Sequence, residues 1–186
     1  LSGPFLLGGL LSPQTEPFEF IIQFMSVYIC LFGGVTAYNS YWDKDEGPIG
    51  GLEKPPKIRE WMLPASWLIQ ILGLILAFRI GYIFTAFYVV GLLFSVLYSN
   101  PRFRWKGKPF LSFIAIGLGV ALIPTVLGFM AYGGRQTDVY ISLGALGSVF
   151  LILSLYPFSQ LYQIEIDSAR GDRTFAVKYG LKGVIR

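Results

Sequence analysis

A cluster of oxygen-bearing side chains directly follows a long apolar run. Asn39 and Asp43 are four residues apart, and Asp45 and Glu46 come next, before a stretch rich in glycine and proline. On a helix that continues from the apolar run, residues i and i+4 lie on one face. Carboxylates this close repel one another, whereas Mg²⁺ takes carboxylate and amide oxygens as ligands. The cluster predicts a Mg²⁺ site at a helix end, and the alternative is a capped or solvated helix end.

A second cluster, near the end of the chain, repeats this pattern. Gln163 and Asp167 are again four residues apart, which predicts that they share a helix face, and Gly171 permits a turn before Asp172. Two metal-binding ends that face each other and are surrounded by basic residues would hold a diphosphate. The basic residues predicted here to add positive charge are Arg173 and Lys178. The alternative is a charged helix end with a glycine break.

The elements that must position these clusters are long apolar segments. Of the 186 residues, 54% are hydrophobic and 14% are charged, whereas a soluble domain carries about 25% charged residues. A bilayer core of about 30 Å needs about 20 helical residues. We therefore predict an all-α, polytopic membrane helical bundle. The runs that approach this length are Phe18–Tyr38, Trp61–Phe78, Ile80–Tyr98, Phe110–Tyr132 and Val139–Leu161.

The first apolar stretch, Pro4–Leu11, is too short to cross a bilayer. It also lacks the basic region and cleavage site of a signal peptide. We interpret it as the last part of a first helix. Residues 1–186 are then expected to form a single but partial transmembrane domain, in which the first helix is incomplete, five spans follow, and later helices lie outside the chain.

The basic residues predict the orientation of the bundle. Of the 15 Lys and Arg residues, 13 lie on the side that also carries both clusters, and only Arg79 and Arg135 lie on the other. The positive-inside rule assigns the rich side to the cytoplasm. The net charge of +4 then needs no nucleic-acid partner. Eight of the 11 acidic residues share this side, which the rule does not require, so we expect the functional loops there.

The loop of residues 98–110 also lies on this side and contains four basic residues, Arg102, Arg104, Lys106 and Lys108. We interpret these four first as topology signals, with Phe103 and Trp105 as interface anchors. The second interpretation is that they hold a diphosphate or an acidic acceptor.

The sequence has no histidine, which excludes histidine-activated nucleophiles and imidazole-bound metals, and the single cysteine, Cys30, cannot form an internal disulfide.

Both clusters resemble the paired acidic motifs of the UbiA superfamily of membrane prenyltransferases. The first family motif, Asn-x3-Asp-x3-Asp after the second span, matches Asn39 and Asp43. Its last position is Gly47 here, so Asp45 or Glu46 would replace the missing carboxylate. The second motif, Asp-x3-Asp-x3-Gly, often followed by Arg-Thr, has Gln163 in its first position. The positions that match it are Asp167, Gly171, Arg173 and Thr174.

The resemblance implies a bundle of usually nine helices that binds a polyprenyl diphosphate through Mg²⁺. Ionisation would give an allylic cation, which a lipophilic or aromatic acceptor attacks. The essential acids would be Asp43 and Asp167. The implied metal ligands are Asn39, Asp43, Asp45, Glu46, Gln163, Asp167 and Asp172, and the implied diphosphate ligands are Lys57, Arg170, Arg173 and Lys178. The aromatic residues, 17% of the chain, would line a tunnel and stabilise positive charge.

Two other functions compete with this interpretation. A membrane transporter with a carboxylate cation site would place charges midway along its spans, whereas here they gather at helix ends. A CDP-alcohol phosphotransferase also has paired acidic motifs, but its signature is Asp-x2-Asp-Gly-x2-Ala-Arg. This chain has DKDEGPIGG at residues 43–51 instead. The acceptor and the length of the prenyl chain are open at this point.

Overall fold

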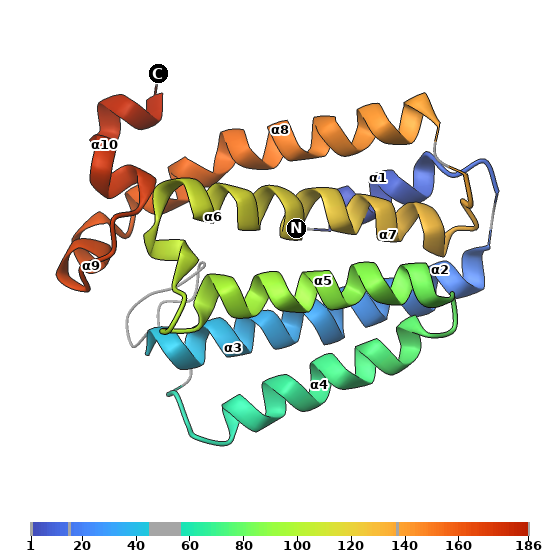
Figure 1. Ribbon diagram of the computed structural model, residues 1–186, viewed down its shortest axis with the longest axis horizontal. Coiled ribbons are helices and arrows are strands. Elements are labelled where there is room, and N and C mark those ends of the chain that lie inside the picture. Colours follow the sequence, from blue (N-terminus) through green and yellow to red (C-terminus); the bar gives the residue numbers. More distant parts are fainter. Residues whose placement is uncertain (1, 15, 45–56, 137, 186) are drawn as a thin grey trace.

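The computed structural model describes residues 2–14, 16–44, 57–136 and 138–185, and every regular element among them is a helix (Figure 1). Four segments of the described chain are long and apolar enough to cross a membrane: Pro17–Asp43, Tyr82–Ser99, Pro109–Ala131 and Val139–Leu161. The all-α membrane bundle is therefore confirmed. The span expected at Trp61–Phe78 is shorter than predicted, because helix α4 covers only the 16 residues Met62–Ala77, which extend about 24 Å.

Two of the four long spans are interrupted by π-helical turns. The first consists of α2 (Pro17–Met25), the π-helical η1 (Ser26–Phe32) and α3 (Gly33–Asp43). The third consists of α6 (Pro109–Ile116), the π-helical η3 (Gly117–Leu122) and α7 (Ile123–Ala131). The remaining elements are α1 (Gly3–Leu10), α5 (Tyr82–Ser99), the short η2 (Trp105–Gly107), α8 (Val139–Leu161), α9 (Ile164–Ala169) and α10 (Phe175–Ile185).

The helix ends follow from local residues. Pro17 and Pro109 occupy first helical positions, where the missing N–H has no partner to lose. Asp138 caps α8 by accepting a hydrogen bond from the Ile141 N–H at 3.0 Å. Lys44 ends α3 in a left-handed conformation with φ 49°, directly after Asp43. Because α3 ends here, Asn39 and Asp43 of the first cluster lie at one end of the helical bundle.

Helix α1 packs closely against α7 through two glycines. A Cβ atom on Gly8 would overlap the backbone of Thr125, and one on Gly128 would overlap the backbone of Phe5. Small residues of this kind let membrane helices approach each other. The expectation that Pro4–Leu11 is helical is met by α1, whose Phe5 is buried in the central hydrophobic cluster.

The long helices cross the bundle in alternating directions (Figure 1). The C-terminal ends of α3, α5 and α8 therefore lie at one end of the molecule, together with the start of α6 and with α9 and α10 (Figure 1). Both acidic clusters and the loop between α5 and α6 belong to this end. The fold thus brings both clusters to one side, as the sequence predicts.

Candidate functional site

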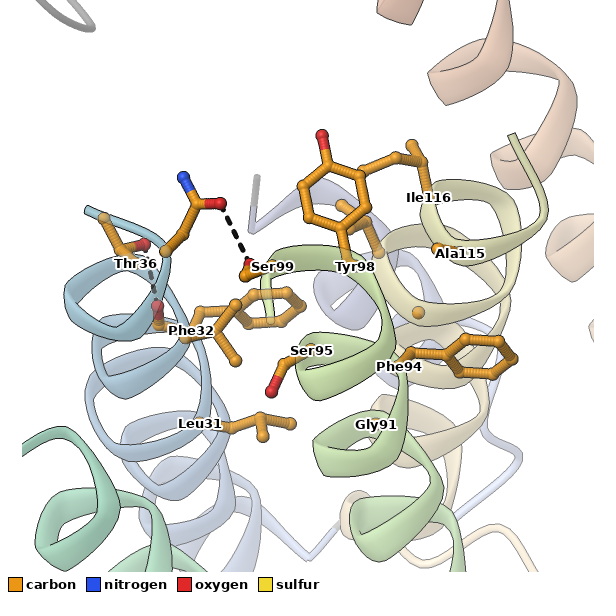
Figure 2. A pocket seen from close by; sticks show the side chains of 14 residues that line it. Leu31, Phe32, Thr36, Gly91, Phe94, Ser95, Tyr98, Ser99, Ala115 and Ile116 are labelled. Atoms are coloured by element: carbon orange, nitrogen blue, oxygen red, sulfur yellow. Dashed lines mark hydrogen bonds between the residues drawn. The ribbon is translucent and has the colours of Figure 1, made fainter. Parts of the chain in front are cut away.

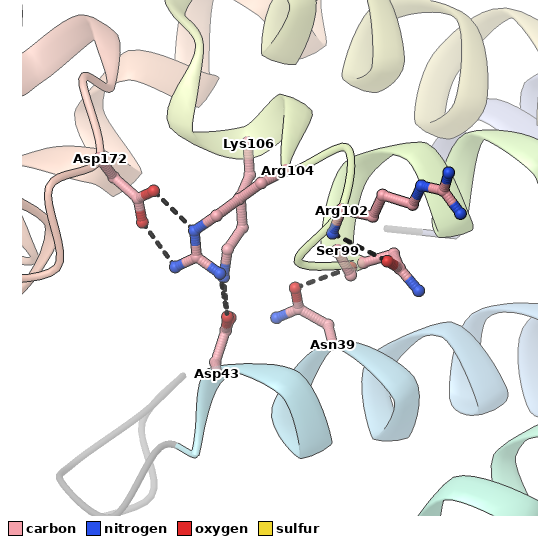
Figure 3. A network of polar contacts seen from close by, with 8 residues as sticks. Asn39, Asp43, Ser99, Arg102, Arg104, Lys106 and Asp172 are labelled. Carbon is pink, nitrogen blue, oxygen red and sulfur yellow. Dashed lines mark hydrogen bonds and ion pairs between the residues drawn. The ribbon is translucent and has the colours of Figure 1, made fainter.

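The two acidic clusters line one pocket of about 250 Å³ at this end of the bundle. Figure 3 shows Asp43 and Asn39 rising from α3 toward Asp172 and toward the loop that follows α5. The pocket therefore joins residues from the two distant parts of the sequence that were predicted to act together. Its lining residues are Asn39, Asp43, Tyr98, Lys106, Tyr156, Ser159, Gln160, Gln163, Asp167, Arg170, Asp172 and Thr174.

The first cluster is held by the last turns of α3. Asn39 and Asp43 lie one turn apart on the face that borders the pocket. The Asn39 Oδ1 accepts a hydrogen bond from the Ser99 hydroxyl at 2.9 Å, which fixes the amide against the end of α5. Asp43 is buried. Asp45 and Glu46, the other two predicted ligands, lie outside the described residues.

The second cluster is built differently from the sequence-based expectation. Gln163 and Asp167 do not lie on one continuous helix, because α8 ends at Leu161 and α9 begins at Ile164. Gln163 is the residue directly before α9, and the Asp167 N–H donates to the Gln163 carbonyl at 2.8 Å in the first turn of α9. Both side chains still border the pocket, and Asp167 is buried whereas Gln163 is exposed.

Gly171 provides the turn that the sequence predicts. Its φ of 79° is in the left-handed region that glycine adopts without steric cost. The turn lets the Asp172 N–H donate to the Asp167 carbonyl at 2.9 Å, which returns Asp172 to the pocket. Glu165 remains exposed and does not border the pocket, so the charge next to Asp167 comes from Asp172.

The environment of Asp167 alters its proton affinity. Burial raises the pKa of its carboxyl above the ordinary aspartate value, and the nearby charge of Asp172 raises it further. A hydrogen bond with Thr174 and the charges of Lys106 and Arg170 act in the opposite direction. The balance is a carboxylate whose negative charge is only partly compensated by the protein, which suits a group that binds a cation.

Two basic residues of the loop between α5 and α6 bind the acidic clusters. The Arg104 Nε and Nη2 atoms each donate to one Asp172 carboxylate oxygen at 2.7 Å, and Arg104 Nη1 lies 3.9 Å from Asp43 (Figure 3). The Lys106 ammonium forms an ion pair with Asp43. Our first interpretation of this loop, as topology signals alone, is wrong for these two residues. The four basic residues of the loop follow one another at every second position. Their spacing therefore does not indicate that Arg104 and Lys106, and not Arg102 and Lys108, contact the acids.

The local backbone shows that this loop is docked on the second cluster. Arg104 has a left-handed conformation, with φ 44°, which is unfavourable for a residue with a side chain. The Gly107 carbonyl accepts a hydrogen bond from the Arg173 N–H at 2.9 Å, and a Cβ atom on Gly107 would overlap the Asp172 carboxylate. Hydrogen bonding to Asp172 also raises the pKa of Arg104, so its guanidinium stays charged.

Trp105 in the same loop differs from the interface anchor that the sequence predicts. Its ring packs edge-on against Phe94 of α5, with ring centroids 6.4 Å apart. Phe103 is exposed, as expected of an anchor.

The predicted diphosphate ligands fall into two groups. Arg170 borders the pocket. Lys57, Arg173 and Lys178 are all described residues, are exposed, and do not border it. The Lys178 ammonium instead lies over the aromatic rings of Phe110 and Tyr179, 5.7 and 5.0 Å from their centroids.

The donor set of the pocket fits Mg²⁺ in its chemistry. The available ligands are carboxylate and amide oxygens, and Mg²⁺ in proteins commonly uses one or two carboxylates with waters and substrate phosphates. Within the described part of the chain, no group of three acidic residues is arranged to hold a metal ion by itself. Lys106 pairs with Asp43 and Arg104 pairs with Asp172 in this arrangement.

An apolar pocket of about 190 Å³ adjoins the polar one, with Asn39 and Tyr98 lining both. It extends between the first span, α5 and the α6–η3 segment (Figure 2). The Tyr98 and Tyr156 hydroxyl oxygens are 3.1 Å apart beside the junction. A polar compartment with acids and bases thus lies next to an apolar compartment that could take a hydrocarbon chain.

The UbiA prenyltransferase family model matches residues 1–186 of the sequence. The chain belongs to this family.

Relatives of this UbiA chain carry prenyltransferase names. The chloroplastic 2-acylphloroglucinol 4-prenyltransferase of Humulus lupulus is 28% identical over 160 residues, covering 78% of this chain and 38% of that protein. The chloroplastic 2-acyl-4-prenylphloroglucinol 6-prenyltransferase of the same plant is 24% identical over 166 residues, covering 81% and 40%. The chain thus spans about two fifths of the length of these relatives.

Solved structures share the fold of this UbiA chain. A UbiA homolog from Archaeoglobus fulgidus bound to Cd²⁺ superposes with a TM-score of 0.76 at 17% identity, over 99% of this chain and 65% of the other. The homolog from the same organism bound to DMAPP and Mg²⁺ gives a TM-score of 0.76 at 18% identity, over 99% and 66%.

Proposed function

We propose that this chain is the part of a membrane prenyltransferase that binds a prenyl diphosphate and ionises it. The observation that carries the proposal is that the polar and apolar pockets adjoin each other, with Asn39 and Tyr98 lining both. An amphiphilic substrate with a charged head and a hydrocarbon tail matches a polar compartment beside an apolar one. The prenyltransferase relatives and the fold shared with a homolog bound to DMAPP and Mg²⁺ support this function.

In this proposal, the diphosphate occupies the polar pocket. Asn39, Asp43, Gln163 and Asp167 would hold Mg²⁺, and Asp172 becomes available when Arg104 turns from it to the phosphate oxygens. Bound Mg²⁺ would neutralise the charge that develops on the departing diphosphate. Lys106, Arg104 and Arg170 supply positive charge from the protein itself, and Arg can bind phosphate oxygens through two parallel hydrogen bonds.

The chemistry follows from charge separation at the junction of the pockets. The allylic C–O bond breaks, its electron pair leaves with the diphosphate, and positive charge spreads over the allylic carbons. The pocket walls below the junction, such as Phe32, Val35 and Ile116, keep water from capturing this cation. A nucleophilic carbon of the acceptor then forms the new bond and loses its proton.

We further propose that the acceptor is an aromatic, phenolic compound and that the site faces the cytoplasm. The named relatives prenylate 2-acylphloroglucinols, which are aromatic. Phenolic rings are electron-rich and attack carbocations. The concentration of Lys and Arg on the site side of the bundle supports the cytoplasmic orientation.

The competing functions have less support. The described charged residues of the site lie where helices end, not midway along a span as in a cation pathway. The family match also disfavours a CDP-alcohol phosphotransferase.

The test uses membranes that contain the full-length protein, a labelled prenyl diphosphate and a panel of phenolic acceptors, with Mg²⁺ or with EDTA. We expect Mg²⁺-dependent transfer that Asp43→Asn or Asp167→Asn reduces by at least 100-fold, because each variant removes a buried charge from the pocket. Glu165→Gln is the matched control, since Glu165 is exposed outside the pocket, and should keep near-normal activity. Full turnover by either aspartate variant contradicts the proposal.

A further inference from the structure

The apolar pocket is closed at the end opposite the polar site. Figure 2 shows Tyr98 and Ser99 at one end of this pocket and Leu31 and Gly91 at the other. Beyond Leu31 and Gly91 lies the central hydrophobic cluster, in which Tyr88 and Leu127 have no exposed surface. A chain that enters from the polar site therefore meets packed protein, not bilayer, at the far end.

The length of the pocket can be measured along α5. Gly91 and Ser99 are both in this helix, and their separation of eight residues corresponds to about 12 Å of helix rise. An extended chain of three single bonds spans about 3.3–3.6 Å, so the four bonds that one isoprenyl unit adds span about 4.5–5 Å. The pocket therefore accommodates about two isoprenyl units.

We propose that this pocket selects the length of the prenyl chain, with Leu31 and Gly91 as its floor and a geranyl group as the preferred tail. The proposal rests on the proposed function. Leu31 is 2% exposed. A Cβ atom on Gly91 would lie 3.3 Å from Leu31 Cδ2 and 4.0 Å from Ile123 Cγ2. Any side chain at residue 91 therefore takes up space at the bottom of the pocket, and a smaller residue at position 31 adds space there.

The residues at the bottom of the pocket cannot easily move to make space for a longer tail. Tyr88 lies one turn from Gly91 on α5, and its hydroxyl donates to the Gln70 carbonyl of α4 at 3.2 Å. This bond and the full burial of the Tyr88 ring fix the layer under the floor. Interiors packed in this way resist insertion of additional carbons.

The side wall of the pocket is also occupied. Phe94 lies 3.3 Å from the position of a Cβ atom on Gly119, and the Trp105 ring packs against Phe94. Ile116 and Val120 line both this pocket and a larger apolar cavity of about 740 Å³ beside α1 and α8, which also borders the polar pocket at Tyr156 and Ser159. A tail that lies in the smaller pocket would have to pass Ile116 and Val120 to reach this cavity.

The experiment compares dimethylallyl, geranyl, farnesyl and geranylgeranyl diphosphates as substrates of the full-length protein in membranes. For the wild type, we expect the highest kcat/KM with geranyl diphosphate and a value at least ten-fold lower with geranylgeranyl diphosphate. Leu31→Ala should raise the farnesyl-to-geranyl ratio of kcat/KM at least ten-fold. Gly91→Leu should shift the preference to dimethylallyl diphosphate by a similar factor. The matched control is Leu93→Ala, because Leu93 lies on the same helix and is 56% exposed.

The outcomes separate this proposal from the proposed function. Equal rates with all four diphosphates, or equal shifts in Leu31→Ala and Leu93→Ala, overturn the length selection and leave the prenyltransferase function intact. Absence of transfer with every diphosphate overturns both. If a variant does not fold, the test is the binding of unreactive thiolodiphosphates of the four lengths to the wild type. We expect the geranyl analogue to raise the thermal unfolding temperature most. Equal increases with all four analogues overturn the length selection.

Discussion

Arg104 holds the two acidic clusters together when no other cation is bound, and its replacement tests this role. Arg104→Gln keeps a side chain of similar length but removes the guanidinium that forms two hydrogen bonds to Asp172, both at 2.7 Å, and lies 3.9 Å from Asp43. Hydrogen bonds between charged groups each contribute about 1.5–3 kcal/mol when well shielded. Because the Arg104 side chain is 24% exposed, solvent screening reduces the sum of the two bonds, and we expect a loss of about 2 kcal/mol in unfolding free energy.

The same substitution should increase the response to Mg²⁺. Without the guanidinium, the charge of Asp172 is uncompensated beside Asp167, whose charge already interacts unfavourably with it. A divalent cation that binds the folded state stabilises it in proportion to the logarithm of its concentration over Kd. Added Mg²⁺ should therefore recover most of the lost stability in Arg104→Gln, and it should stabilise the wild type less.

The assay is thermal unfolding of the full-length protein in detergent, first in EDTA and then with increasing MgCl₂. Arg102→Gln is the matched control for net charge, since Arg102 belongs to the same loop, is exposed, and points away from the cluster in Figure 3. Equal unfolding temperatures for the two variants in EDTA would refute the role of Arg104 in joining the clusters. A Mg²⁺ response no larger than that of the wild type would refute the competition between Arg104 and the metal.

Two further predictions concern protonation and orientation. Burial raises the pKa of Asp167, so the folded state binds this proton more tightly than the unfolded chain does, and ionised Asp167 lowers stability at neutral pH. In EDTA at pH 7, Asp167→Asn should therefore have a higher free energy of unfolding than the wild type. This difference should vanish as the pH falls below the ordinary aspartate pKa. A variant less stable than the wild type at pH 7 contradicts the reasoning. For orientation, in a Cys30→Ala background, a cysteine at Lys108 should be shielded from an impermeant thiol reagent in intact cells, whereas one at Gln136 should react. The reverse labelling would place the site outside the cytoplasm.

The sequence by itself determined the membrane bundle and the shared end of the bundle at which Asp43 and Asp167 lie. Backbone groups in hydrocarbon must pair within their own segment, so apolar runs as long as Val139–Leu161 have helix as their available structure. The same constraint places the polar residues that follow each run at a helix end. Alternation of the spans then brings Asp43 and Asp167 to one side. These inferences need only local composition, the spacing of residues and the parity of the spans.

Tertiary structure alone decided which charges meet. Arg104 and Lys106 pair with acids that are more than sixty residues away in the sequence, while Arg102 and Lys108, of the same type and in the same loop, remain exposed. The break between α8 and α9 at Gln163, and the apolar pocket that ends at Leu31 and Gly91, are also products of packing. The physical reason is that ion pairs and cavity walls depend on distances between atoms of different helices. Those distances are set by the packing of whole surfaces, such as α1 against α7 at Gly8 and Gly128, and the pattern within one segment does not contain them.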